Sequence, residues 1–159
     1  MYEKQKNEKD ILYILEHLKP EDQHEAQVQK GDNFKEIILK EIMDSHSRTY
    51  LGCKKIDDTP VCVGGYTDTN EKGVGIVWLL STPEIEKYKT CLLRNVIQAF
   101  NEIDNKYWLT CNILFSENKF AKSWLRKIGF NFNNPKPEGI DIPDGFEFFY
   151  RIRETRGLK

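Results

Sequence analysis

The stretch SENKFAKSWLRKIGF, residues 116–130, joins the polar start of a helix to a helix end and the beginning of a strand. Asn118 is a good helix opener because its side chain can accept a hydrogen bond from a backbone N–H of the first turn. Gly129 suits the left-handed residue that commonly ends a helix. The apolar positions between them recur at helical spacing: Phe120, Ala121, Trp124, Leu125 and Ile128.

Upstream of this helix, the apolar periodicity predicts three short helices followed by three strands. The helices are expected over residues 10–18, from Pro20 through Val28, and from Phe34 to Ile42. The strands are expected in TYLGCKKI, VCVGGYT and VGIVWLL, residues 49–56, 61–67 and 74–80, as an antiparallel meander. The third is apolar almost throughout and is therefore expected to be central. Gly64 and Gly65 predict a bulge or a close backbone approach.

A long crossover should then connect the third strand to a parallel neighbour. The sequence Ser81-Thr82-Pro83-Glu84 predicts the start of a helix, and after a possible irregularity near residues 87–89 an apolar stripe continues it to about Asp104. The next strand is expected in YWLTCNILF, residues 107–115, parallel to residues 74–80. After residue 130, Phe130 and Phe132 should begin a strand, residues 133–145 a loop, and FEFFYRIR, residues 146–153, the last strand.

Length and composition favour one globular domain over residues 1–159, with flexible ends at residues 1–9 and 154–159. The net charge of −1 argues against a nucleic-acid partner, and the basic residues Arg151, Arg153, Arg156 and Lys159 are interpreted as a solvated end. No run of about 18 apolar residues predicts a membrane span. The four cysteines and three histidines lack zinc spacing, so no metal site is predicted; Cys53 and Cys62 are expected to face each other across a hairpin.

This order of elements resembles the GNAT superfamily of acyl-CoA N-acyltransferases over residues 10–153. The resemblance implies an α+β fold, with a mixed, mostly antiparallel sheet flanked by helices. A narrower resemblance, to the GNAT-like proteins of tailed phages that include the internal virion (internal core) proteins of short-tailed phages, is carried by three segments. These are residues 10–25 with Leu18-Lys19-Pro20-Glu21-Asp22 and Glu25, residues 78–85, and Asn118 with Trp124-Leu125 and Gly129-Phe130.

The GNAT resemblance also implies a chemistry that this chain supports poorly. The superfamily holds the cofactor pyrophosphate on a glycine-containing loop after the central strand, but residues 81–93 contain no glycine. Leu125 stands where active members usually carry the tyrosine that protonates the leaving thiolate. Tyr88, Tyr107 and Tyr150 are possible substitutes, each more simply a packing residue. No general base is assigned; Glu84 and Glu86 are candidates by location only, with capping and solvation as the simpler roles.

No catalytic residue is therefore predicted. If acyl-CoA binds, the cofactor-binding candidates are Leu80, Ser81, Lys87, Lys89 and Asn118. Each also has a simpler interpretation: the lysines as solubilising residues and Asn118 as a helix cap. Trp78 and Trp124 either line a groove or fill the core, and Cys91 is interpreted as a buried thiol without a catalytic partner.

Two functions remain open. The first is a non-catalytic phage protein without a cofactor, made in the host cytoplasm and acting in the virion or its assembly. Its partners would be phage structural or assembly proteins, bound through the early helices and residues 131–145. The alternative is an active N-acetyltransferase that uses acetyl-CoA through a divergent cofactor loop. The sequence does not distinguish the non-catalytic phage protein from an inhibitor or modifier of a host protein. It also predicts no oligomeric state.

Overall fold

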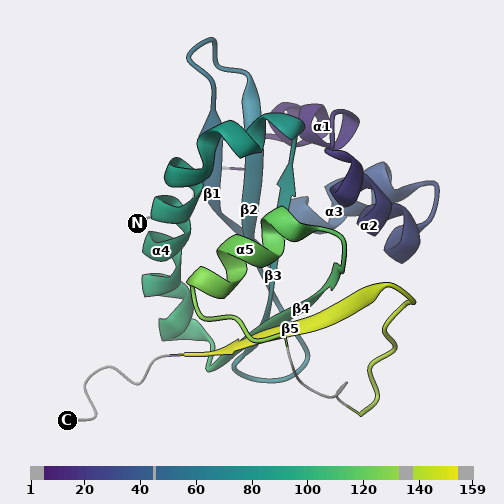
Figure 1. The fold of residues 1–159 in the computed structure, drawn as a ribbon, viewed down its shortest axis with the longest axis vertical. Helices are drawn as coiled ribbons and strands as arrows, with labels where there is room; N and C mark the ends of the chain where they lie inside the picture. The colour runs from purple at the N-terminus through teal and green to yellow at the C-terminus, as the bar shows by residue number, and fades with distance from the viewer. Residues whose placement is uncertain (1–5, 45, 133–137, 154–159) are drawn as a thin grey trace.

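A computed structural model describes residues 6–44, 46–132 and 138–153 of the chain, without the side chains of residues 49–51. A five-stranded sheet lies between two groups of helices (Figure 1). The elements are α1 (Glu8–Glu16), α2 (Pro20–Lys30), α3 (Phe34–Met43), β1 (Ser47–Lys54), β2 (Pro60–Asp68), β3 (Val74–Ser81), the 3-10 turn η1 (Pro83–Tyr88), α4 (Lys89–Lys106), β4 (Leu109–Phe115), α5 (Lys119–Lys127) and β5 (Phe146–Ile152).

The strands follow one another in the sheet in chain order, from β1 to β5, and only the β3–β4 pair is parallel. The three helices, the meander, the crossover and the last strand that the sequence predicts are thus confirmed. Helix α1 starts earlier than Asp10 because Asn7 caps it, accepting a hydrogen bond from the backbone N–H of Asp10.

The central strand β3 is covered on both faces, as predicted. Val77 and Leu79 pack in a core that includes α4 and α5, whereas Trp78 and Leu80 pack in a second core built by α1, α2 and α3. This assignment alternates along the strand because successive side chains point to opposite faces of a sheet. Both faces of β3 are therefore occupied, and a ligand can reach it only along an edge or through a gap in the sheet.

The two glycines of β2 mark a close backbone approach, as predicted. A Cβ atom at Gly65 would lie 1.9 Å from the carbonyl oxygen of Arg48 on β1, and the β1–β2 register shifts between Thr49 and Leu51. Cys53 and Cys62 lie opposite each other in the same pair of strands, as predicted.

A helix starts after Ser81 and Thr82, as predicted, but its first part is the 3-10 turn η1, with Thr82 at the N-cap and Pro83 in the first turn. The irregularity predicted near residues 87–89 is where η1 ends and α4 starts, at Lys89. Two details are wrong: the side-chain cap and a strand after residue 130. The side chains expected to cap a helix have other partners, because Ser81 contacts Asp22 and Thr82 donates a hydrogen bond to the carbonyl oxygen of Val61. Around Phe130 and Phe132 there is a single bridge between Asn131 and Tyr150 instead of a strand. The two phenylalanine rings pack on Phe149, which draws this segment onto the core.

Of the expected loop at residues 133–145, residues 133–137 lie outside the described part of the chain, as do residues 154–159 of the C-terminal tail. Among the described residues, no helix is long and apolar enough to cross a membrane.

Candidate active site

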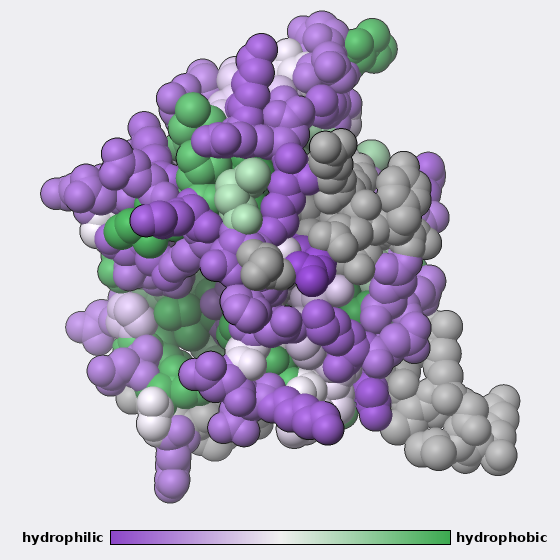
Figure 2. Space-filling model, turned by 180° about the vertical axis from the view of Figure 1, so that it is seen from behind, coloured by the Kyte–Doolittle hydropathy of each residue, from purple (hydrophilic) through white to green (hydrophobic). Residues whose placement is uncertain are grey.

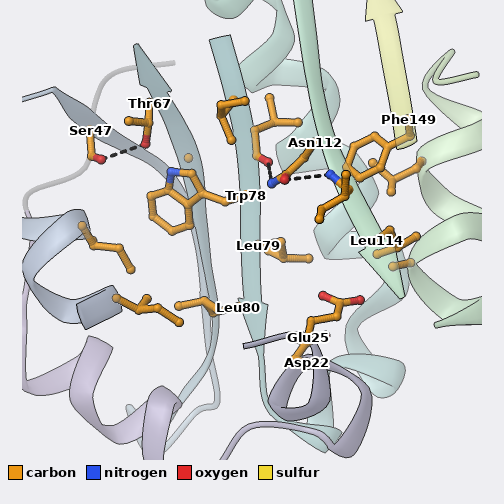
Figure 3. Close-up of a pocket in the computed structure, with 18 of the residues that line it drawn as sticks. Asp22, Glu25, Ser47, Thr67, Trp78, Leu79, Leu80, Asn112, Leu114 and Phe149 are labelled. Atoms are coloured by element: carbon orange, nitrogen blue, oxygen red, sulfur yellow. Dashed lines mark hydrogen bonds between the residues drawn. The ribbon is translucent and has the colours of Figure 1, made fainter. Parts of the chain in front are cut away.

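A gap in the sheet between β3 and β4 is the feature on which the candidate site is built. The two parallel strands pair only from Val74–Ile76 to Leu109–Cys111, although β3 pairs with β2, and β4 with β5, along nearly their whole lengths. Just beyond the last paired residues, Asn112 donates a side-chain hydrogen bond of 2.8 Å to the carbonyl oxygen of Val77 across the gap (Figure 3). From there toward their carboxyl ends the strands separate.

The separation opens into a cavity of about 800 Å³. Its wall includes residues on both faces of the sheet, from α2 and α3 on one side and from α4 and α5 on the other, so it passes through the gap. Seen from behind, the surface is hollowed, with apolar side chains at the bottom of the hollow and hydrophilic ones around it (Figure 2). The cavity can therefore admit one reactant from each face of the sheet.

Two carboxylates of α2 span the wide end of the gap. Asp22 Oδ2 accepts hydrogen bonds from the Ser81 backbone N–H (2.9 Å) and hydroxyl (2.8 Å) at the end of β3. Glu25 Oε1 accepts one from the Phe115 backbone N–H (3.1 Å) at the end of β4. Where two strands separate, their backbone N–H groups lose the acceptors that the neighbouring strand would provide. Buried N–H groups need another acceptor in its place. Residues three apart share a helix face, so one helix satisfies a donor on each strand.

Asn118 connects the two carboxylates to α5. Its Nδ2 donates to Glu25 Oε1 (3.0 Å) and Asp22 Oδ1 (3.2 Å), while its Oδ1 accepts from the Ala121 backbone N–H (3.3 Å). The same Oδ1 accepts a hydrogen bond of 3.0 Å from Lys19 Nζ, which lies 3.8 Å from Asp22 Oδ1 and 4.8 Å from the centre of the Phe120 ring. Asn118 is thus the helix cap that the sequence favours and also the centre of a buried polar cluster, Lys19–Asp22–Glu25–Asn118.

The two carboxylates differ in how much of each is already engaged. Both oxygens of Asp22 have hydrogen-bond partners, and its side chain is buried. Glu25 Oε2 has no hydrogen-bond partner within the described residues, and the carboxylate projects into the space between β3 and β4 (Figure 3). Glu25 is therefore the carboxylate with an oxygen left for a ligand, whereas Asp22 holds the site together.

The surroundings also change the acidity of both groups. Burial raises the pKa of Asp22, against the lowering effect of the Lys19 charge and the Ser81 and Asn118 hydrogen bonds. Burial and the neighbouring Asp22 charge raise the pKa of Glu25 to about 7, although its hydrogen bonds from Asn118 and Phe115 act in the opposite direction. Glu25 is accordingly close to half-protonated at neutral pH, which suits a group that accepts and returns a proton.

This pKa leads to a test that does not depend on any ligand. Because Glu25 binds its proton more tightly in the folded chain (pKa about 7) than in the unfolded chain (ordinary pKa 4.5), the folded state loses stability as pH rises from about 4.5 to 7. We expect the free energy of unfolding of Glu25→Gln, relative to the wild type, to increase over this range and to level off above pH 8. Urea denaturation at pH 5, 6, 7 and 8 measures the difference; a pH-independent difference would contradict the shifted pKa.

The structure brings together three of the five cofactor-binding candidates. Leu80, Ser81 and Asn118 line the cavity. Lys87 and Lys89 are not among its lining residues: Lys87 Nζ lies 3.3 Å from Glu84 on the exposed turn η1, and Lys89 Nζ lies 5.8 Å from the centre of the Phe120 ring. Both lysines belong to the segment that links β3 to α4, where the GNAT resemblance places the cofactor phosphates.

The tyrosine substitutes considered from the sequence lie elsewhere. Within the described residues the cavity lining contains no tyrosine, and Leu125, which does line it, is buried. Tyr107 donates a hydrogen bond to Asp68, and burial together with this bond raises its pKa, so it is a poor proton donor. Glu84 forms ion pairs with Lys55 and Lys87 at the surface. It is therefore a surface residue, one of the simpler roles that the sequence suggested for it.

The indoles of Trp78 and Trp124 do more than fill the core. Both residues line the cavity, and their Nε1 atoms are buried without a hydrogen-bond partner in the described part of the chain. Such buried donors normally have a hydrogen-bond partner, so these two N–H groups are available to a molecule with acceptor atoms in the cavity. Together with the open Glu25 oxygen, they supply donors and a base on the wall of one cavity.

Sequence reasoning missed Lys19, Asp22 and Glu25 as site residues. In the sequence they belong to a segment that carries the narrower resemblance and to the start of a predicted helix around Pro20. The partners that give them a role in the site lie 59 to 99 positions away. The available signal was the spacing of Asp22 and Glu25, which places both on one helix face next to a predicted cap, Asn118.

Comparison with solved structures shows which fold this is. Neither a family sequence model nor a curated protein sequence matches the chain. An aminoglycoside 6′-acetyltransferase type Ii superposes with a TM-score of 0.67 at 12% identity, over 96% of this chain and 97% of that one. A spermidine N-acetyltransferase from Vibrio cholerae, in complex with CoA and spermine, gives 0.63 at 13% identity over 96% and 95%. An acetyltransferase of the GNAT family from Streptococcus pneumoniae gives 0.60 at 13% identity over 96% and 99%.

The chain therefore has the GNAT acetyltransferase fold, as the sequence predicts. The expectation of a non-catalytic component of a phage particle is wrong. The structural neighbours are acetyltransferases, and none of them connects the chain with internal virion proteins. That expectation came from the missing glycine loop and the leucine in place of tyrosine, but the gap between β3 and β4 is open and carries a cavity.

Proposed function

We propose that the protein is an acetyl-CoA-dependent N-acetyltransferase that uses Glu25 as its proton-transferring residue. The observation that carries this proposal is the cavity through the β3–β4 gap, with an unengaged oxygen of Glu25 in it. A transferase for two reactants needs a site open to both, and a general base within reach of the amine. The fold of the neighbours supports the same activity, and one of them is described in complex with CoA.

The lining residues fit the acetyl-bearing end of the cofactor better than its phosphate end. The cavity walls between the strands are largely apolar, and the Trp78 and Trp124 N–H groups offer polar contacts to the amide-bearing arm. For the phosphates, the segment that follows β3 offers Lys87 and Lys89, beside Glu84 and Glu86, on η1 and at the start of α4. We therefore expect binding to depend mainly on the cavity.

When bound, acetyl-CoA supplies an acetyl group activated as a thioester, with the CoA thiolate as leaving group. The ionised form of Glu25 accepts a proton from the attacking amine, and its raised pKa leaves the carboxyl able to return that proton to the thiolate. This proton transfer replaces the tyrosine that Leu125 displaces. Asp22 and Lys19 act by positioning: they fix Asn118, which in turn holds Glu25 Oε1 and leaves Oε2 facing the cavity.

The charge of the cavity wall indicates a cationic acceptor. Five carboxylates and two lysines line it: Asp22, Glu25, Glu41, Asp44 and Asp68, with Lys19 and Lys30. Asp22 is paired with Lys19, Glu41 with Lys30 and Asp68 with Lys106, so the remaining negative charge comes from Asp44 and the ionised form of Glu25. Carboxylates favour the approach of positively charged groups, and a primary amine is protonated at neutral pH. We therefore propose primary amines that carry at least one positive charge as the acceptor class.

Acetyl-CoA binding is the direct test of this function. Isothermal titration of the full-length chain should give a Kd in the micromolar range, corresponding to about −8 kcal/mol. Ala121→Trp, which places an indole on the cavity wall, should abolish this binding, whereas Ser123→Trp on the exposed side of the same helix should not. Circular dichroism should show native helix content in both variants, which separates lost binding from lost folding. No binding by the wild type at millimolar acetyl-CoA would overturn the proposal.

A further inference from the structure

Three of the four cysteines form a cluster between the sheet and the start of α4. Cys53 on β1 lies opposite Cys62 on β2, and Cys91 lies in the first turn of α4. The fourth, Cys111, is on β4 at a distance along the sheet. All four are thiols in the structure. The cluster is separate from the cavity described above, because none of its three members lines that cavity.

The sulfur atoms of Cys53 and Cys91 are in contact. Their Sγ atoms are 3.2 Å apart, although the residues are 38 positions apart in sequence. Asn95, one turn further along α4, directs its side-chain amide at both sulfurs, 3.5 Å from that of Cys91 and 3.9 Å from that of Cys53. A disulfide has a length of about 2 Å, so a small approach of the two side chains would suffice to form one.

The two thiols differ in access to solvent in a way that orders their reaction. Cys91 is exposed, while Cys53 is 4% and Cys62 is 2% exposed. A small oxidant such as hydrogen peroxide therefore meets Cys91 first. The nearest second thiol is then Cys53, which is held beneath it. An exposed thiol next to a second thiol is the geometry of a cysteine pair that oxidises reversibly; the raised pKa of Cys91, caused by contact with Cys53 and burial, slows the reaction at neutral pH.

We propose that Cys53 and Cys91 are a redox-modifiable pair that forms an intramolecular disulfide with hydrogen peroxide and thereby ties β1 to the first turn of α4. In the first step Cys91 loses two electrons to peroxide: the O–O bond breaks, an S–OH group forms and one water is released. In the second, Cys53 sulfur attacks the Cys91 sulfur, the S–OH bond breaks, and the leaving hydroxide takes the Cys53 proton to form a second water. Two thiols and one peroxide thus yield one disulfide and two waters.

The bond would constrain the part of the chain that leads from the central strand to the crossover helix. The closed segment contains β2, β3 and η1, and α4 would be anchored at its start. Closing a loop of this length restricts the unfolded chain, so the midpoint of thermal unfolding should rise by about 5–10 °C on oxidation and return on reduction. The inference does not depend on the acetyltransferase proposal.

The test uses the reduced full-length protein treated with a small excess of hydrogen peroxide. It is run at pH 8.5 because contact with Cys53 and burial raise the pKa of Cys91. After blocking with N-ethylmaleimide, intact mass spectrometry should show two fewer adducts than the untreated control, and non-reducing peptide mapping should identify a Cys53–Cys91 cross-link. Cys91→Ser should abolish the cross-link, and the matched controls Cys62→Ser and Cys111→Ser should retain it.

Each other outcome would overturn the pair. These outcomes are a Cys53–Cys62 cross-link, a dimer linked through Cys91, further oxidation of Cys91 to a sulfinic acid without any cross-link, and loss of the cross-link in Cys62→Ser. Thermal unfolding of Cys91→Ser before and after peroxide gives a second readout. A wild-type rise in midpoint that persists in this variant would show that the stabilisation has another origin.

Discussion

Replacing Glu25 with glutamine should lower kcat/KM for acetyl transfer by about 100- to 10,000-fold, the range that a general base typically contributes. Glutamine preserves the size of the side chain and an oxygen that accepts hydrogen bonds from Asn118 and Phe115, but it has no titratable oxygen to take the amine proton. Release of free CoA thiol, followed with spermidine and an aminoglycoside as acceptors, measures the effect.

The pH profile separates a base from a merely structural residue. In the wild type, kcat/KM should rise with pH through about 7, since only the ionised form of Glu25 accepts a proton, and this limb should be absent in Glu25→Gln. Glu21→Gln on the same helix, outside the cavity lining, is the matched control and should retain rate and profile. If Glu25→Gln keeps the wild-type rate, Glu25 is not the general base. The acetyltransferase proposal itself would then still be decided by the acetyl-CoA binding test.

Much of the fold could be predicted because it is encoded in short-range patterns. The alternation of Val77, Trp78, Leu79 and Leu80 between two cores follows from a strand covered on both faces, and the positive φ of Gly129 follows from its place after a helical stripe. These signals need only neighbours within a few residues. The order of elements then limits the possible topologies, which is why the fold could be recognised at such low sequence identity.

The site could not be predicted in the same way because its parts act at long range. Ser81 was expected to cap a helix, but Asp22, 59 positions away, takes both of its donors. The loss of a glycine loop and of a tyrosine at Leu125 favoured a non-catalytic protein, because the sequence shows which familiar groups are missing but not that Asp22 and Glu25 lie at the gap between β3 and β4. At a gap between strands, backbone N–H groups lack partners in the sheet. Which side chains accept hydrogen bonds from them depends on tertiary packing and not on neighbouring residues in the sequence.

The second large effect concerns stability. Asp22→Ala should lower the free energy of unfolding by about 3–5 kcal/mol, because it removes the partner of the buried Lys19 ammonium and leaves the Ser81 backbone N–H without an acceptor. Asp22→Asn keeps the shape and one acceptor oxygen but no charge, so its loss should be smaller. Urea denaturation at pH 7 should show lower midpoints with unchanged slopes, while the exposed control Asp32→Ala should match the wild type. If Asp22→Ala unfolds at the wild-type midpoint, the cluster does not hold α2 across the gap, and the positioning of Glu25 must come from elsewhere.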